Sequence, residues 1–269
     1  MLNASLLLVL AAGPWFPKVV EKFKPISLPF DAKNVAVPKT GLTNFEIEQL
    51  GVAKSTSKEL EVLRNWKPEP EEGETNTLWP VGAFKRGEVQ VLVVRLDQEM
   101  PMGSISDSFA LTYDPTGKLL DGFHLASNTS TEAGGYTFTS KLEANFTFTG
   151  SGELRVPMME EGLPGELVVQ STVKGTLLPS GKVQREERFS TKDGAFTDPK
   201  SKEELRVFGA RVFYRGTDAD KPFQELQVEG DTVRFKKGGK PYQLSWSDTR
   251  DAVSCKNPDG TVQRFERTW

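Results

Sequence analysis

Alternating hydrophobic and polar positions dominate the chain from about residue 81 onward. Successive side chains of a strand point to opposite faces, so a period of two indicates extended structure. Between residues 89 and 96 both faces are apolar, with Val89, Val91 and Val93 on one and Leu92, Val94 and Leu96 on the other. A strand that is apolar on both faces is typical of a sheet covered on both sides. We therefore predict a central strand here.

The longest alternation covers residues 136–149. Its even positions are mostly apolar and its odd positions are polar, and the apolar set is Tyr136, Phe138, Leu142, Ala144, Phe146 and Phe148. A period of two in a segment rich in Thr and Phe excludes a helix. The pattern indicates either one long bent strand or two strands whose turn has no sequence signal.

Turn motifs divide the remaining strands. Asp114-Pro-Thr-Gly117 predicts a hairpin, and Asn257-Pro-Asp-Gly260 predicts a type I turn followed by glycine at positive φ. Residues 194–204, which contain Asp198-Pro199 and a Lys/Glu cluster, are predicted to form a loop between two units.

The N-terminal part has a different pattern. Residues 14–40 contain five prolines and are predicted to be extended chain lying over a core. Thr43-Asn-Phe-Glu46 and Thr56-Ser-Lys-Glu59 are capping-box patterns, each followed by apolar residues at helical spacing. These patterns predict two short helices. Residues 67–77 are predicted to be a solvated acidic loop.

Together these patterns predict a mainly β protein. We expect an antiparallel β-sandwich or open barrel with two short N-terminal helices and a C-terminal β-meander. The main β domain, with its N-terminal extended and helical segment, would cover residues 13–193. Residues 205–269 would form a small second β unit.

The first twelve residues resemble a secretory signal peptide. An apolar run from Leu6 to Ala12 is too short to span a bilayer but has the length of a signal's apolar region, with small residues suited to cleavage after Ala11. No Lys or Arg precedes the run, so the alternative is a cytoplasmic protein whose N-terminus packs on the core as a strand or helix. We expect a secreted or periplasmic protein without a transmembrane segment.

Composition excludes several classes of function. The 269-residue chain has 34 Lys and Arg against 37 Asp and Glu, a net charge of -3, and non-specific nucleic-acid binders need an excess of basic residues. One cysteine and one histidine exclude an internal disulfide, a cysteine-based zinc site and a histidine cluster on a metal. We therefore expect no nucleic-acid partner, no metal and no cofactor.

Candidate catalytic residues are few. His124 lies on a predicted strand whose hairpin partner contains Ser106, Asp107 and Ser108, so a histidine, a nucleophile and a carboxylate lie on neighbouring strands. A half-buried or surface histidine in a sheet is the simpler interpretation. Cys255 alternates with Val253 and is expected to be a small core residue.

Several short motifs occur in a recognisable order. Leu28-Pro-Phe30, Pro80-Val-Gly82 and the hairpin from Tyr113 to Lys118 precede the Thr- and Phe-rich strands. In this respect residues 24–190 resemble uncharacterised β-rich exported proteins of bacteria. The resemblance implies export and a β-rich fold, and it implies no activity or site residue.

Three functions remain. The first is an exported, non-catalytic binding or interaction protein of the bacterial cell envelope, with a protein or carbohydrate partner contacted by loops at the ends of the sheets. The second is a hydrolase that uses His124 with a nearby serine and a carboxylate. The third is a barrel that binds an apolar ligand in a cavity lined by Phe109, Phe138, Phe146 and Phe148.

Overall fold

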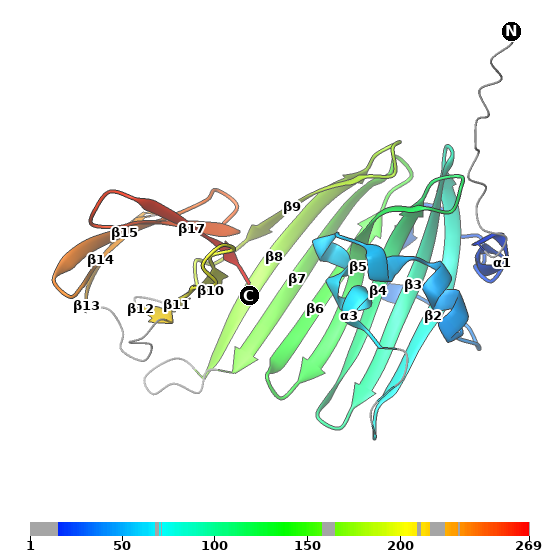
Figure 1. The fold of residues 1–269 in the computed structure, drawn as a ribbon, viewed down its shortest axis with the longest axis horizontal. Helices are drawn as coiled ribbons and strands as arrows, with labels where there is room; N and C mark the ends of the chain where they lie inside the picture. Colours follow the sequence, from blue (N-terminus) through cyan, green and yellow to red (C-terminus); the bar gives the residue numbers. More distant parts are fainter. Residues whose placement is uncertain are drawn as a thin grey trace, which may run out of the picture. The chain divides into compact units, whose positions relative to one another are not determined.

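The computed structural model describes residues 16–67, 70, 72–157, 165–208, 211–215, 224–230 and 232–268. The predicted signal peptide, residues 1–12, lies outside this part of the chain. The described residues form two antiparallel sheets with a few short helical segments (Figure 1). The predicted mainly β, antiparallel fold class is confirmed.

The first sheet is a meander in which each strand pairs with the next. Its path is β2 (Thr75–Arg86), β3 (Val89–Met100), β4 (Gly103–Tyr113), β5 (Leu119–Thr131), β6 (Gly134–Leu142), β7 (Thr147–Pro157), β8 (Glu166–Leu177) and β9 (Val183–Phe189). The two-residue strand β1 (Phe30–Asp31) pairs with β6. As predicted, both faces of β3 are apolar and buried.

Short helical segments precede β2. They are α1 (Phe16–Val20), η1 (Ala32–Asn34), α2 (Asn44–Gln49), η2 (Val52–Lys54), η3 (Lys58–Leu60) and α3 (Glu61–Asn65), where η denotes a 3-10 helix. Figure 1 shows several of them lying across one face of the first sheet. Among the described residues, none of the helices has the length and apolar character needed to cross a membrane.

One of the two predicted capping boxes is confirmed. At the start of α2, Glu46 N–H donates to Thr43 Oγ1 at 3.4 Å, and Thr43 N–H donates to Glu46 Oε2 at 2.8 Å. Beyond α2 the chain turns at Gly51, whose φ is +70°. Two of the unpaired N–H groups at the helix start are satisfied in this way.

The second predicted capping box, at Thr56–Glu59, is wrong. The N-cap of η3 is Ser57, which makes no side-chain capping bond. The Glu59 carboxylate instead accepts hydrogen bonds from the Arg185 guanidinium and, at 3.5 Å, from the backbone N–H of His124. The Glu59 carboxylate bonds to a charged partner on a distant strand and not to the backbone N–H of the cap, because charge-assisted hydrogen bonds are stronger than neutral ones.

The helical segments bury an apolar face against β2, β3 and β4. Leu50, Leu60 and Leu63 pack in one cluster with sheet residues that include Phe109 and Tyr113. Tyr113 is fully buried, and its hydroxyl donates to the carbonyl of Leu50 at 3.0 Å. This bond satisfies a phenol that would otherwise be a costly buried polar group.

The long alternation at residues 136–149 consists of two strands, β6 and β7. Their turn places Phe146 at φ +66°, and Asn145 Oδ1 accepts from both the N–H and the hydroxyl of Thr147. The turn contains neither glycine nor proline, which explains why alternation alone could not reveal it.

The second sheet contains eight strands. They are β10 (Gly194–Thr197), β11 (Glu204–Phe208), β12 (Arg211–Arg215), β13 (Gln224–Glu229), β14 (Thr232–Lys237), β15 (Lys240–Trp246), β16 (Ala252–Lys256) and β17 (Val262–Arg267), in the spatial order β12-β11-β10-β17-β16-β15-β14-β13. The loop predicted at residues 194–204 is wrong over its first four residues, which form β10, and at its last residue, Glu204, which begins β11. Strand β10 pairs with both β11 and β17, and its Phe196 is fully buried.

The described residues form two compact units. The first lies within Met1–Glu132, Thr137–Gly150 and Gly175–Arg185, and the second lies within Ala133–Tyr136, Ser151–Lys174 and Glu186–Trp269. In the second unit the predicted turn at 257–260 is confirmed. Gly260 has φ +85°, and its N–H donates to the carbonyl of Asn257 at 3.0 Å.

Candidate functional site

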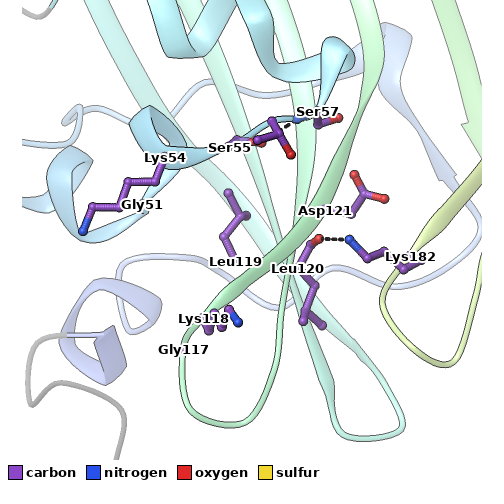
Figure 2. Close-up of a pocket in the computed structure, with 11 residues that line it drawn as sticks. Gly51, Lys54, Ser55, Ser57, Gly117, Lys118, Leu119, Leu120, Asp121 and Lys182 are labelled. Atoms are coloured by element: carbon purple, nitrogen blue, oxygen red, sulfur yellow. Dashed lines mark hydrogen bonds between the residues drawn. The ribbon is translucent and has the colours of Figure 1, made fainter.

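A cleft of about 530 Å³ lies at one end of the first sheet, within the first unit (Figure 2). It is lined by residues from three parts of the sequence: Gly51 and residues 54–57, residues 117–121, and Lys182. The volume falls in the range of small-molecule sites, about 300–1,000 Å³. Side chains that line it include the lysines Lys54, Lys118 and Lys182 and the carboxylate of Asp121.

The first wall is held in place by Arg64 of α3. Its Nη1 donates to the carbonyl of Ser55 at 3.0 Å and to that of Ser57 at 3.4 Å. The N–H of Ser57 donates in turn to Ser55 Oγ at 3.1 Å. These bonds fix the backbone of a segment that has no strand or helix of its own between η2 and η3.

The second wall is the hairpin between β4 and β5. Asp114 Oδ1 accepts from the N–H groups of Thr116 and Lys118, at 2.9 and 3.0 Å, and closes the turn. Gly117 has φ +81°, and a Cβ there would lie 2.6 Å from the ring of Phe16. Only glycine satisfies both the backbone conformation and the close approach.

The third wall is the turn between β8 and β9. Lys182 Nζ donates to the carbonyl of Leu120 at 2.7 Å, and Val183 N–H donates to Asp121 Oδ2 at 3.1 Å. Thr112 Oγ1 donates to the carbonyl of Gly181 at 2.7 Å. The turn is thereby attached to β4 and β5, which are distant from β9 in the strand order.

Alternate turns of an antiparallel meander lie at the same end of the sheet. The β4–β5 turn and the β8–β9 turn are two such turns, and they contain the related sequences Pro115-Thr-Gly-Lys118 and Pro179-Ser-Gly-Lys182. Each places a lysine directly after the turn glycine. From the sequence alone both segments were predicted only as turns, and the shared lysine becomes significant once the strand order places the two turns at the same end of the sheet.

The electrostatic character of the cleft is positive. The Asp121 carboxylate already accepts from two backbone N–H groups, at Gly122 (2.9 Å) and Val183 (3.1 Å). Lys54 and Lys118 are exposed. Figure 2 shows Asp121 and Lys182 at one side of the cleft and Lys54 at the other. An anion in the cleft would meet lysines from three walls.

The structure brings together two of the candidate catalytic residues. His124 Nε2 lies 3.4 Å from Asp107 Oδ1, and the two side chains are 16% and 5% exposed. Neither atom has a hydrogen bond to another described residue. The imidazole stacks on Phe109, with ring centroids 4.7 Å apart, and contacts Phe138 at 5.6 Å.

The two candidate serines lie elsewhere. Ser106 and Ser108 alternate with Asp107 along β4, so their side chains point to the opposite face. Ser106 Oγ donates to Asp97 Oδ1 at 2.8 Å, and the same carboxylate accepts from Trp79 Nε1 at 3.0 Å. The geometry does not bring either serine to His124.

The four phenylalanines predicted to line an apolar cavity are packed in separate groups. Phe109 and Phe138 flank His124, whereas Phe148 stacks on Phe123 with centroids 4.6 Å apart. Phe146 stacks on Phe84 at 6.4 Å. None of these rings lines the cleft.

Metal-binding and thiol chemistry find little support in the described part of the chain. No three His, Cys, Asp or Glu side chains gather there in a way that could hold a metal ion. Cys255 is buried in the core of the second sheet, and burial raises its pKa to about 11. A thiol with this pKa is almost entirely protonated at neutral pH and is a poor nucleophile.

Comparison with known proteins adds no functional assignment. No protein-family model matches the sequence, and no curated protein matches it closely enough to indicate a relative.

Proposed function

We propose that the chain is a non-catalytic binding protein, exported to the bacterial cell envelope, whose first unit holds a small anionic ligand in the lysine-lined cleft. The observation that carries the proposal is the convergence of three loop segments, each with a lysine, around one volume of about 530 Å³. Binding residues are often found on loops that a rigid scaffold positions, and this cleft has that construction.

The chemistry of the cleft favours a carboxylate or phosphate group. Lysine ammonium groups form charge-assisted hydrogen bonds with such anions, and these bonds are stronger than neutral ones. The hydroxyls of Ser55, Thr56 and Ser57 add neutral donors and acceptors on one wall. We therefore expect a polar anion of metabolite size rather than an apolar molecule.

The test is a titration of the ¹⁵N-labelled full-length chain with inorganic phosphate, citrate and glycerol, followed by NMR. We expect citrate or phosphate to shift the amides of residues 51–57 and 117–121, and glycerol to shift none. The double variant Lys54→Ala/Lys118→Ala should have an affinity for the anion at least about tenfold lower than that of wild type. Lys39→Ala, which removes an exposed lysine outside the cleft, should leave the affinity unchanged. Equal weakening by both variants would contradict the proposal.

Export is tested separately, on protein isolated from its own host. A mature N-terminus near Ala12, in protein recovered from the periplasm or medium, supports export. An intact Met1 in cytoplasmic protein contradicts it, and the binding proposal does not depend on this result.

The Asp107–His124 pair supports a second candidate function, hydrolysis. A carboxylate beside an imidazole is the part of a catalytic triad that orients the base, and here it lies 3.4 Å from the ring nitrogen. Screening with ester and amide substrates, comparing the wild-type chain with His124→Ala, tests this candidate. An activity that disappears in the variant, while the fold persists by circular dichroism, would replace the binding proposal.

A further inference from the structure

A row of hydrogen-bond donors crosses one face of the second sheet. Gln227 of β13 pairs with Arg234 of β14, Arg234 pairs with Gln243 of β15, and Gln243 pairs with Lys256 of β16. Directly paired residues share a face, and neighbouring strands are about 4.8 Å apart. The four side chains therefore form a row about 14 Å long.

The row lies on the outer face of the sheet. Gln227, Arg234 and Lys256 are exposed, whereas their strand neighbours Val233 and Cys255 belong to the buried core. This alternation follows the two faces of the strands, one packed and one solvated. A ligand can thus reach all four side chains from one direction.

The row forms part of a groove of about 620 Å³ in the second unit. Lys236 pairs with Pro241 and adds a third cation, and Pro258 belongs to the turn at the end of β16. The prolines supply apolar surface beside the charged groups. The groove therefore combines cations, amides and a small apolar surface.

The carboxylates near the groove do not cancel its positive charge. Asp259 lines the groove and keeps its negative charge, because the N–H and the hydroxyl of Thr261 from which it accepts, at 2.9 and 2.7 Å, are neutral; it offsets one of the three cations. Arg234 Nη1 donates to Glu229 Oε2 at 2.9 Å, but both side chains are more than half exposed. Exposed pairs of this kind are weak and exchange readily with a competing anion.

We propose that this groove binds a linear polyuronate, a polysaccharide with one carboxylate on each sugar. The row alternates amides with cations, so a carboxylate can pair with Arg234 or Lys256 while sugar hydroxyls exchange hydrogen bonds with the glutamines. A sugar residue of an extended polysaccharide advances by about the width of one strand, so the carboxylates of every second sugar can meet Arg234 and Lys256, which lie two strands apart. This site lies in the second unit and goes beyond the ligand proposed for the first.

Two other anionic polymers fit the groove less well. A peptide recognised by a sheet usually adds to an edge strand through its backbone, whereas this row crosses four strands. Single-stranded nucleic acid is usually held by aromatic side chains that stack on its bases. The two aromatic residues that line the groove, Phe235 and Tyr242, stack on each other on the packed face of the strands instead. Both polymers serve as competitors in the test.

The experiment is calorimetric titration of the full-length chain with size-fractionated oligomers of polygalacturonic acid. We expect saturable binding that weakens with salt, as expected for a charged ligand. Fully methyl-esterified oligomers of the same length keep the sugar chain but lose the charge, and they should not bind. Monomeric galacturonate should bind at least about tenfold more weakly, because it contacts one step of the row.

The double variant Arg234→Gln/Lys256→Gln should have an affinity for the oligomer at least about tenfold lower than that of wild type. Lys200→Gln is the matched control, since Lys200 is an exposed lysine of the same unit outside the groove, and it should bind as wild type. If circular dichroism shows that the double variant does not fold, the single variant Lys256→Gln, which changes an exposed side chain, becomes the test. Its affinity for the oligomer should be about threefold lower than that of wild type.

Four results would overturn the proposal. They are the absence of binding to polygalacturonate, equal binding of the methyl ester, equal binding of wild type and the folded charge variant, and tighter binding of polyglutamate or single-stranded DNA. None of these results bears on the cleft of the first unit, because its anion titration uses separate probes and separate variants.

Discussion

Replacing Arg267 by methionine should destabilise the second sheet. The guanidinium of Arg267 donates to three backbone carbonyls: Nε to Arg250 at 2.9 Å, Nη1 to Asp193 at 2.7 Å and Nη2 to Thr191 at 2.8 Å. It also lies over the rings of Phe189 and Phe196, 4.5 and 4.6 Å from their centroids. One side chain thus connects β17 to the segment before β10.

The size of the effect follows from two opposing contributions. Burial lowers the pKa of the Arg267 guanidinium to about 10 although nearby carboxylates raise it, and this shift corresponds to a net cost of about 3 kcal/mol for keeping the charged form. Because Arg267 is only partly buried, we take the lower end of the range for bonds from a charged donor, about 1.5 kcal/mol each, and about 1 kcal/mol for each ring contact, which gives about 6.5 kcal/mol in all. Methionine removes all of these contributions, including the guanidinium donors to three carbonyls. We expect the free energy of unfolding to fall by about 3–4 kcal/mol.

Hydrogen exchange of the full-length chain measures this effect locally. The amide of Arg267 donates to Asp251 at 2.8 Å, and that of Thr268 donates to Ala195 at 2.9 Å. A loss of about 3 kcal/mol should speed exchange at these amides by about two orders of magnitude, provided that they exchange by opening of this sheet. The amides of β3, in the first sheet, provide the internal reference.

Arg188→Met is the matched control. Arg188 donates to the carbonyl of Asp248 at 3.3 Å, but its side chain is 57% exposed. Its loss should change stability by less than about 0.5 kcal/mol. If Arg267→Met speeds exchange in β10 and β17 less than about tenfold, or speeds β3 equally, the reasoning from buried charge-assisted bonds is refuted.

Three further predictions concern buried or hydrogen-bonded groups. Tyr113→Phe should lower the stability of the first unit by about 1 kcal/mol, measured by urea unfolding, because the carbonyl of Leu50 loses its donor. Cys255 should resist iodoacetamide at pH 8 in the native chain and react rapidly in urea, because burial raises its pKa to about 11; rapid native labelling would contradict this. Hydrogen bonds from the Gln263 amide and, to a smaller extent, from the N–H of Lys200 lower the pKa of Asp198 from 3.8 to about 2. The ionised carboxylate therefore stabilises the fold above pH 4, and this contribution is lost as the pH falls toward 2. Gln263→Leu should therefore lose less stability over that interval, and an unchanged acid profile would contradict the assignment.

The strands were predictable because alternation and turn chemistry agree along most of the chain. Where they disagreed, the prediction stayed open or failed, for identifiable reasons. The turn at Phe146 places a phenylalanine at positive φ, a conformation that sequence patterns assign to glycine or asparagine. Strand β10 has four residues, too few to show a period, and Phe196 is buried only because β11 and β17 flank it.

The candidate sites depend on contacts that a linear pattern does not contain. Hairpin pairing of β4 with β5 correctly placed Asp107 near His124, but the alternation of faces along β4 separates them from Ser106 and Ser108. Glu59 was assigned to a local capping box, and its carboxylate instead contacts Arg185, 126 residues away in sequence. Long-range ion pairs of this kind become visible only when the register of every strand is known.

The wall of the cleft formed by residues 51–57 is fixed at both ends by the sheet it covers. Immediately before it, Leu50 accepts the Tyr113 hydroxyl at 3.0 Å, and soon after it Glu59 bonds to Arg185 and to the N–H of His124. A loop held at both ends loses less conformational freedom when a ligand binds, so preorganisation favours affinity. If the cleft binds an anion as proposed, removing the Glu59 carboxylate should weaken binding although Glu59 does not line the cleft. The fixed position of the loop, and not only the charge of the lysines, would then determine the affinity of the cleft for an anion.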